Sequence, residues 1–80
     1  MFHKIASVSP LPQYKLSVLF ENGERRSYDV APLFERWDAF RALESVRGLF
    51  EQVRVDAGGY GVSWNDELDL SGEELYFFGV

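Results

Sequence analysis

Side chains that could carry catalysis are scarce in this sequence. His3 is the only histidine, and the chain of 80 residues has no cysteine. Acid–base and nucleophilic catalysis normally need a second group that supports the first. A Ser-His-Asp triad could use only His3, and no Gly-x-Ser-x-Gly nucleophile motif occurs. We expect His3 to be a surface or edge-strand side chain near a mobile terminus, and we predict that the protein is not an enzyme.

The acidic segment that begins at Glu67 is the stretch most similar to a metal-binding loop. Aligned from Glu67, carboxylates stand at positions one and three of a calcium loop, with Ser71 and Gly72 at positions five and six. Position twelve should be a bidentate glutamate but is Phe78. The spacing of Ser71 and Glu74 fits a helix capping box, which explains Ser71 without an ion. We therefore predict no metal and no cofactor.

Charge is distributed unevenly along the chain. Residues 1–54 contain all eight Lys and Arg together with seven Asp and Glu, a net charge of +1. Residues 55–80 contain six acidic side chains and no basic one, which brings the total to −5. A negative chain gains little from counterion release on nucleic acid, so we expect no direct nucleic-acid binding. The acidic third either keeps a small domain in solution or binds a basic partner.

Size and composition limit the architecture. Eighty residues make one domain, residues 1–80, and without cysteine there is no disulfide framework. We see no leader sequence, and the apolar runs fall short of the roughly 18 residues of a membrane span. We therefore expect a soluble cytoplasmic protein that does not interact with membranes.

Alternating apolar residues predict strands. Tyr14, Leu16, Val18 and Phe20 alternate with more polar positions, and Asn22-Gly23 fits a type I′ turn into a return strand of residues 24–30. Further strands are expected over residues 4–8, 53–55 and 60–64. The last two form a second hairpin around Gly58-Gly59, a stretch that lacks the lysine of a phosphate-binding loop.

Spacings of three and four predict helices. A short turn is expected over residues 31–36, and an amphipathic segment over residues 37–50, where Gly48 either breaks the helix or permits close packing. A last helix begins after Ser71. The resulting order of strands and helices predicts an α+β fold: a mainly antiparallel sheet of about five strands, with two or three short helices packed on one face.

Four groups of residues resemble a known family. They are Leu11-Pro12-x-Tyr14-x-Leu16, Phe20-x-Asn22-Gly23-Glu24 with Tyr28-Asp29-Val30, Phe50-x-x-Val53-x-Val55-Asp56, and Trp64-Asn65-x-x-x-Asp69-Leu70-Ser71 before Glu74-Leu75-Tyr76. Their order and spacing are similar to the domain-of-unknown-function family numbered 2442, a group of small bacterial proteins. The chain departs from that pattern at residues 66–68, where a smaller, glycine-like turn residue is expected.

The resemblance implies an α+β domain, standalone or fused to a helix-turn-helix domain, and in some relatives encoded beside another small protein as in toxin–antitoxin pairs. It carries over no catalytic residue. We hypothesise a non-catalytic protein-interaction module, an accessory or antitoxin-like member of a two-gene bacterial pair. The expected partner is a basic protein, because the C-terminal third is acidic and its helix apolar, and a homodimer is left open.

Six residues are candidates for partner binding: Trp64, Asp66, Asp69, Glu73, Tyr76 and Phe77. The Tyr76-Phe77-Phe78 run gives the last helix apolar residues on all sides, so it is either covered within the domain or meets another chain. Trp37 is a further aromatic expected at the surface. The alternative function is a small-ligand sensor domain, with a pocket between sheet and helix lined by Trp64 and Tyr60.

Overall fold

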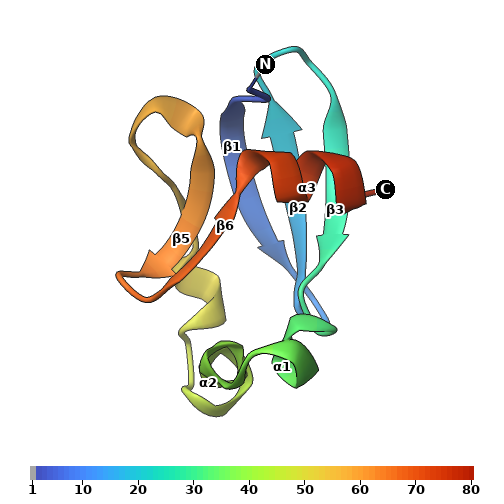
Figure 1. Cartoon of the computed structure of the whole chain (residues 1–80). Helices are drawn as coiled ribbons and strands as arrows, with labels where there is room; N and C mark the ends of the chain where they lie inside the picture. Colours follow the sequence, from blue (N-terminus) through green and yellow to red (C-terminus); the bar gives the residue numbers. More distant parts are fainter. Residues whose placement is uncertain (1) are drawn as a thin grey trace.

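Two three-stranded antiparallel sheets and several short helices make up the fold, which a computed structural model describes for residues 2–80 (Figure 1). The first sheet has the order β1-β2-β3, and the second has the order β4-β5-β6. The strands are β1 (Ile5–Leu11), β2 (Lys15–Phe20), β3 (Arg25–Asp29), β4 (Arg54–Val55), β5 (Gly61–Asn65) and β6 (Leu68–Ser71). The predicted α+β class is therefore confirmed, although its single sheet of about five strands is only approximate.

The first sheet follows the predicted alternation. Leu16, Val18 and Phe20 of β2 are buried, while the residues between them are partly exposed. The predicted type I′ turn at Asn22-Gly23 is wrong, because Gly23 has a positive φ (92°) and Asn22 does not. The side chain of Asn22 instead accepts a hydrogen bond from the Glu24 N–H at 2.9 Å.

The other hairpin of this sheet holds two consecutive residues in the left-handed region. Gln13 has a φ of 64° and Tyr14 a φ of 60°, between β1 and β2. Positive φ at both central residues is the signature of a type I′ turn, which is normally met by Asn or Gly. The Tyr14 ring packs edge-on against Phe34 and Phe50, and its carbonyl accepts the Val30 N–H at 2.9 Å. These contacts hold the unfavourable turn in place.

The helical elements between the sheets are short. They are α1 (Leu33–Arg36), η1 (Asp38–Arg41), α2 (Ala42–Ser45), η2 (Phe50–Gln52) and η3 (Ala57–Gly59), where η denotes a 3₁₀ helix. The amphipathic segment predicted over residues 37–50 forms short helices instead of one helix. Val46 is extended, and Gly48, where a break was one of the two alternatives, has a φ of 81°. Phe40, Leu43 and Phe50 are buried, whereas Val46 is 52% exposed.

The second sheet contains a strand that the sequence analysis missed. Residues 68–71 were expected to belong to an acidic turn, but they form β6 and pair with β5, with Val62 opposite Leu70. Leu68 and Leu70 are buried while Asp69 and Ser71 are exposed, the alternation of a strand with one covered face.

The last helix, α3 (Gly72–Phe78), lies across both sheets and contacts β3, β5 and β6 (Figure 1). The side chain of Ser71 caps it by accepting the Glu74 N–H at 3.1 Å. In a capping box the Glu74 carboxylate would also accept the Ser71 N–H. Here this carboxylate instead accepts the Tyr28 hydroxyl of β3 at 2.8 Å. After the helix, Val80 pairs with Ser27 through two backbone hydrogen bonds and so covers the outer edge of β3.

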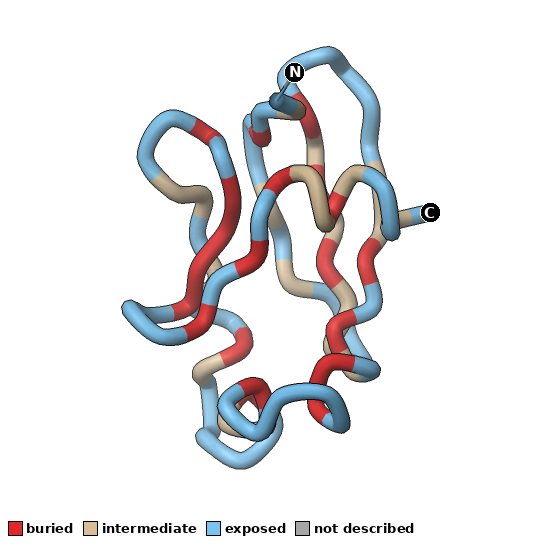
Figure 2. The backbone as a smooth tube through the Cα atoms, in the orientation of Figure 1, coloured by how far each residue is buried: buried red, intermediate tan, exposed pale blue. Residues whose placement is uncertain are grey.

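One cluster of buried apolar side chains fills the space enclosed by the sheets, α3 and the short helices (Figure 2). Strand β1 runs beside β4 and joins the two sheets along one side. The opposite edges, β3 and β6, are bridged by α3, while α1 and α2 close one end of the molecule (Figure 1). Within residues 2–80 no helix has the length and apolar character needed to cross a membrane.

Candidate functional site

A groove lies along the outer edge of β6, opposite the segment that connects α1 to η1. It has a volume of about 420 Å³, within the range of ligand-binding pockets. The lining residues come from η1, β6, α3 and two connecting segments: Trp37, Ala39, Phe40, Glu67, Asp69, Leu70, Ser71 and Glu74. We refer to these eight residues as the β6 groove.

An aromatic wall forms one side of the groove. Trp37 adopts an extended conformation (φ −137°, ψ 120°) between two helical turns, which leaves its indole 48% exposed. The guanidinium of Arg36 lies 4.4 Å from the indole centroid and holds the ring from one side. Phe40 beneath it is buried, and its ring meets Trp64 of the core edge-on at 6.2 Å.

Carboxylates form the other side. Glu67 and Asp69 are exposed, whereas Glu74 is half-buried and accepts the Tyr28 hydroxyl. Burial, followed by this hydrogen bond, raises the pKa of Tyr28 above its usual range, so the hydroxyl remains a neutral donor to Glu74 at physiological pH. The groove lining contains three acidic side chains and no basic one.

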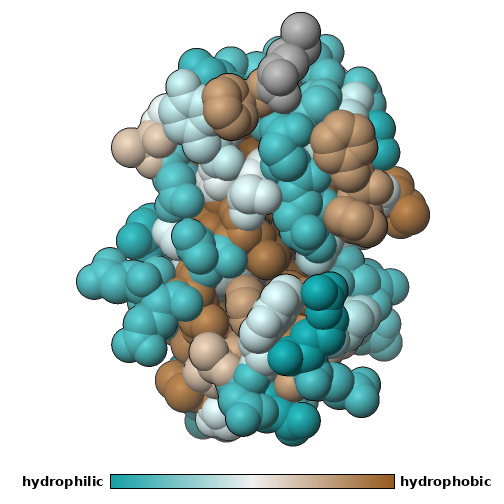
Figure 3. Space-filling model, in the orientation of Figure 1, coloured by the Kyte–Doolittle hydropathy of each residue, from teal (hydrophilic) through white to brown (hydrophobic). Residues whose placement is uncertain are grey.

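A second hollow, of about 410 Å³, continues the groove past the turn between β5 and β6. It shares Ala39 and Glu67 with the first hollow and is lined further by Asp38, Arg41, Ala42, Ser45, Asn65 and Leu68. Arg41 lies 3.7 Å from the Asp38 carboxylate, and both side chains are exposed. In the space-filling view, apolar side chains are visible between polar ones on this face (Figure 3).

The side chains of the β6 groove combine apolar surface with carboxylates. Residues 2–80 contain no group of three or more His, Cys, Asp or Glu side chains placed to hold a metal ion. A partly apolar hollow with carboxylates at its rim suits a ligand that carries both apolar surface and positive charge.

Trp64 must be removed from the six predicted partner-binding residues. It is 2% exposed, and its indole N–H donates to the carbonyl of Phe50 at 3.0 Å inside the core. A partner could reach it only if the domain opened. The sensor pocket expected around Trp64 and Tyr60 is not found, because Tyr60 is 51% exposed at the β5 hairpin and neither residue lines the groove.

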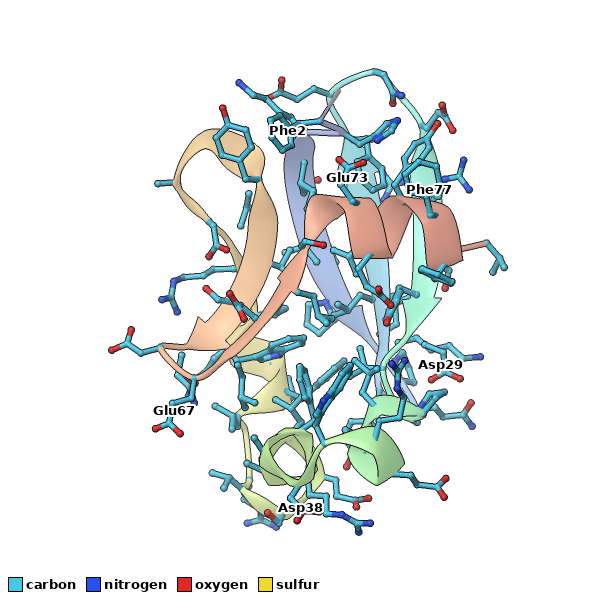
Figure 4. All side chains as sticks on the ribbon, viewed as in Figure 1. Phe2, Asp29, Asp38, Glu67, Glu73 and Phe77 are labelled. Carbon is cyan, nitrogen blue, oxygen red and sulfur yellow. The ribbon has the colours of Figure 1, made fainter. Side chains whose placement is uncertain are left out.

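Glu73, Tyr76 and Phe77 lie on another side of α3, toward the N-terminal strand (Figure 4). The carboxylate of Glu73 accepts the His3 backbone N–H at 2.7 Å and lies 3.0 Å from the His3 ring, which stacks on Tyr76. The backbone hydrogen bond, followed by that of the ring, lowers the pKa of Glu73. His3, expected at a mobile terminus, is therefore fixed to α3, while Phe77 is 65% exposed.

Of the six predicted residues, only Asp69 lines the groove. Asp66 is exposed in the turn between β5 and β6. Glu67 was considered as a calcium-loop position, Leu70 as part of a family motif and Glu74 as a capping residue, but none of them as a partner-binding residue. The alternation of Leu68 and Leu70 with Asp69 and Ser71 could have identified them, because it indicates a strand with one exposed face.

Comparison with known proteins supports this fold. A family model described as a protein of unknown function (DUF2442) matches residues 5–79. The search of curated proteins found no match. Among solved structures, a candidate DNA-binding protein from Nitrosomonas europaea is similar over 98% of this chain, with a TM-score of 0.78 and 22% sequence identity. This chain spans 49% of that protein, and at this identity the likeness establishes a shared fold.

Proposed function

We propose that this chain, which belongs to the DUF2442 family of proteins of unknown function, is a non-catalytic module that binds a basic protein. The observation that carries the proposal is the β6 groove. Its floor and wall are aromatic and apolar, and its charged lining residues are all acidic. Such a surface attracts a cationic partner and repels an acidic one.

The charge of the chain supports the same partner. Residues 55–80, which include β6 and α3, carry six acidic side chains and no basic one, so these elements themselves contribute only negative charge. The field of these charges speeds the approach of a basic protein and is screened within about 8 Å at physiological ionic strength. Binding should therefore weaken as salt is added, while the apolar contacts at Trp37 remain.

Affinity capture with paired baits tests the proposal. The wild-type chain is compared at low salt with a Glu67→Gln, Asp69→Gln variant, and Glu51→Gln serves as a matched control because Glu51 is exposed outside the groove. We expect a basic protein that is retained by wild type and control, lost from the groove variant, and released by salt. Equal retention by all three baits would contradict the proposal.

A role as the accessory or antitoxin-like member of a two-gene pair is a narrower form of this proposal. It requires that the captured protein is the product of the neighbouring gene. Co-expression of the two gene products, followed by size-exclusion chromatography, tests this point, and a neighbouring product that elutes separately would remove it.

A sensor of small cationic ligands is a second candidate function. The volume of the groove, about 420 Å³, lies in the range of small-ligand pockets and favours a sensor. This chain spans about half of the Nitrosomonas europaea protein, and a sensor domain that is part of a longer protein fits that length. A ligand that binds only the native state raises the melting temperature. A thermal-shift screen of small amines, run beside basic peptides, separates the two candidate functions. A small amine alone raises the melting temperature of a sensor, whereas a protein-binding module responds to the peptides.

We propose no direct contact between this chain and DNA. The net charge of −5 and the acidic residues 55–80 oppose the phosphate backbone. The DNA-binding description applies to a protein about twice as long as this chain. Fluorescence anisotropy with labelled duplex DNA at low salt checks this expectation, and saturable binding by this chain would contradict it.

A further inference from the structure

The outer edge of β6 is an unpaired strand edge. In the second sheet β6 pairs with β5 on one side, and no other strand of residues 2–80 pairs with it (Figure 1). Strand edges offer rows of backbone donors and acceptors, and proteins usually cover or interrupt them. The corresponding edge of β3 is covered, because Val80 exchanges two backbone hydrogen bonds with Ser27, at 2.8 and 2.9 Å. The edge of β6 has no such cover.

The register of β6 shows which backbone groups face outward. The Gly72 N–H donates to the Tyr60 carbonyl at 2.8 Å, and the next pairs in the same register are Gly61 with Ser71 and Val62 with Leu70. Hydrogen-bonded and non-hydrogen-bonded pairs alternate along an antiparallel ladder. The N–H and carbonyl of Asp69, and the N–H of Ser71, therefore point away from β5.

The two hollows described above follow this edge from end to end. The first lies along Asp69, Leu70 and Ser71, and the second along Asn65 and Leu68. Residues of η1 form the opposite wall in both, joined by Trp37 in the first hollow and by residues of α2 in the second. A trough beside a strand edge suits an extended backbone, which can pair with the outward groups of the edge, better than a helix, whose backbone groups are already paired within it.

We propose that the partner contributes an extended segment that adds to the outer edge of β6 as a further strand. This inference rests on the proposed function, and it specifies how the basic partner binds. Main-chain hydrogen bonds to Asp69 and Ser71 supply the attachment, as in other cases of strand addition. A helix has its own backbone groups paired internally, and an isolated lysine or arginine could donate to the Asp69 carbonyl but could not accept from the two N–H groups.

The two faces of β6 also predict the sequence of the segment. Side chains of an added strand alternate between the same two faces. On the face of Leu70 they meet Trp37 and Phe40, which requires apolar residues. On the other face they lie beside Asp69 and Glu67, which favours Arg or Lys. The segment should therefore alternate apolar and basic residues.

Synthetic peptides test this inference directly. The probe is a short capped peptide of alternating Arg and Val, and the reference peptide has Glu in place of Arg. Two further probes carry N-methyl groups on all Val amides or on all Arg amides. Because amides alternate between the two edges of a strand, each methylated probe has one edge blocked and keeps its side chains and charge.

We expect the Arg-Val peptide to bind and the Glu-Val peptide not to bind, as measured by isothermal titration calorimetry with the full chain. One methylated peptide should lose affinity by about tenfold or more, because hydrogen bonds to β6 are removed, while the other retains it. If both methylated peptides bind like the parent, strand addition is wrong while the proposed function stands. If the Arg-Val peptide binds no better than the Glu-Val peptide, both proposals fail.

A pair of protein variants gives an independent readout. Asp69→Asn removes the charge and keeps the outward N–H, whereas Asp69→Pro also removes the N–H without breaking a bond to β5. We expect Asp69→Pro to bind the Arg-Val peptide about tenfold more weakly than Asp69→Asn, with unchanged circular dichroism. Equal affinities would overturn the inference. A wild-type dimer that Asp69→Pro converts to monomer would show instead that the edge receives a second copy of this chain.

Discussion

At the scale of single residues, the two tryptophans have opposite roles. Trp64 is enclosed in the core and holds η2 through its bond to the Phe50 carbonyl, whereas Trp37 is half-exposed on the wall of the groove. Sequence alone did not separate them. Trp64 was predicted at an interface because it ends a strand next to acidic residues, and its partner Phe50 lies 14 positions away.

Replacing Trp64 with Phe should lower the free energy of unfolding by about 3 kcal/mol, since a cavity forms and the buried Phe50 carbonyl loses its donor. Trp37→Phe is the matched control and should change stability by less than about 0.5 kcal/mol because its ring is exposed. Urea denaturation measures both. Equal losses for the two variants would contradict the assignment of Trp64 to the core.

Gln13 is one of the two non-glycine residues in residues 2–80 that have a positive φ. At a φ of 64°, Asn is far more common than Gln, so Gln13→Asn should raise the free energy of unfolding by about 0.5 kcal/mol. Gln52→Asn is the control, because Gln52 is exposed and has no positive φ. Thermal denaturation of both variants measures the difference. A loss of stability in Gln13→Asn would mean that the glutamine side chain itself stabilises the turn.

At the scale of elements, the sequence predicted those strands and caps that depend on residues close together in the chain. The alternation in β2 and the cap at Ser71 were read correctly because each rests on residues within a few positions. Strand β6 was missed for the opposite reason, whereas the break at Gly48 was one of the two alternatives that the sequence left open. Asp69 resembles a loop residue until its neighbours Leu68 and Leu70 are seen to face the core. The groove could not be predicted, because Trp37 and Asp69 meet only through tertiary packing.

The attachment of the N-terminal residues to α3 should depend on pH. Hydrogen bonds from His3 lower the pKa of Glu73, so its ionised form stabilises the fold. A lowered carboxyl pKa contributes stability that is present above the unfolded pKa, 4.5 here, and is lost as the pH falls through the folded pKa.

The variant Glu73→Gln should therefore be less stable than wild type at about pH 7, and the difference should shrink as the pH falls to about 3. Chemical denaturation across this range measures the difference. Glu51→Gln is the control, because Glu51 is exposed and forms no side-chain hydrogen bond or ion pair with residues 2–80. A difference between wild type and Glu73→Gln that is independent of pH would contradict the role of the Glu73 charge.

At the scale of the whole molecule, α3 connects the two sheets, which also meet where β1 runs beside β4. The Tyr28 hydroxyl ties the helix to the first sheet through Glu74, and Ser71 links it covalently to the second. Stability of the whole fold should then depend on this bridge. The groove should depend on it as well, because Glu74 lines it.

Tyr28→Phe removes the hydroxyl that donates to the half-buried Glu74 carboxylate, and it should lower the free energy of unfolding by about 1–2 kcal/mol. Amides of α3 should exchange with deuterium faster than those of β2 in this variant. Tyr76→Phe is the control, because the Tyr76 hydroxyl bonds the exposed Glu24 and should matter less. If exchange in α3 and β2 accelerates equally, the helix is not a separate bridge.

The bridge also has a consequence for synthesis on the ribosome. The strands of the first sheet are made first, while β5, β6 and α3, which cover their apolar faces, are made last. His3 finds its partner Glu73 only after 70 further residues have been added. Nascent chains stalled before Gly61 should therefore expose Leu16, Val18 and Phe20 and recruit chaperones. We expect the domain to become resistant to protease only after α3 has left the exit tunnel.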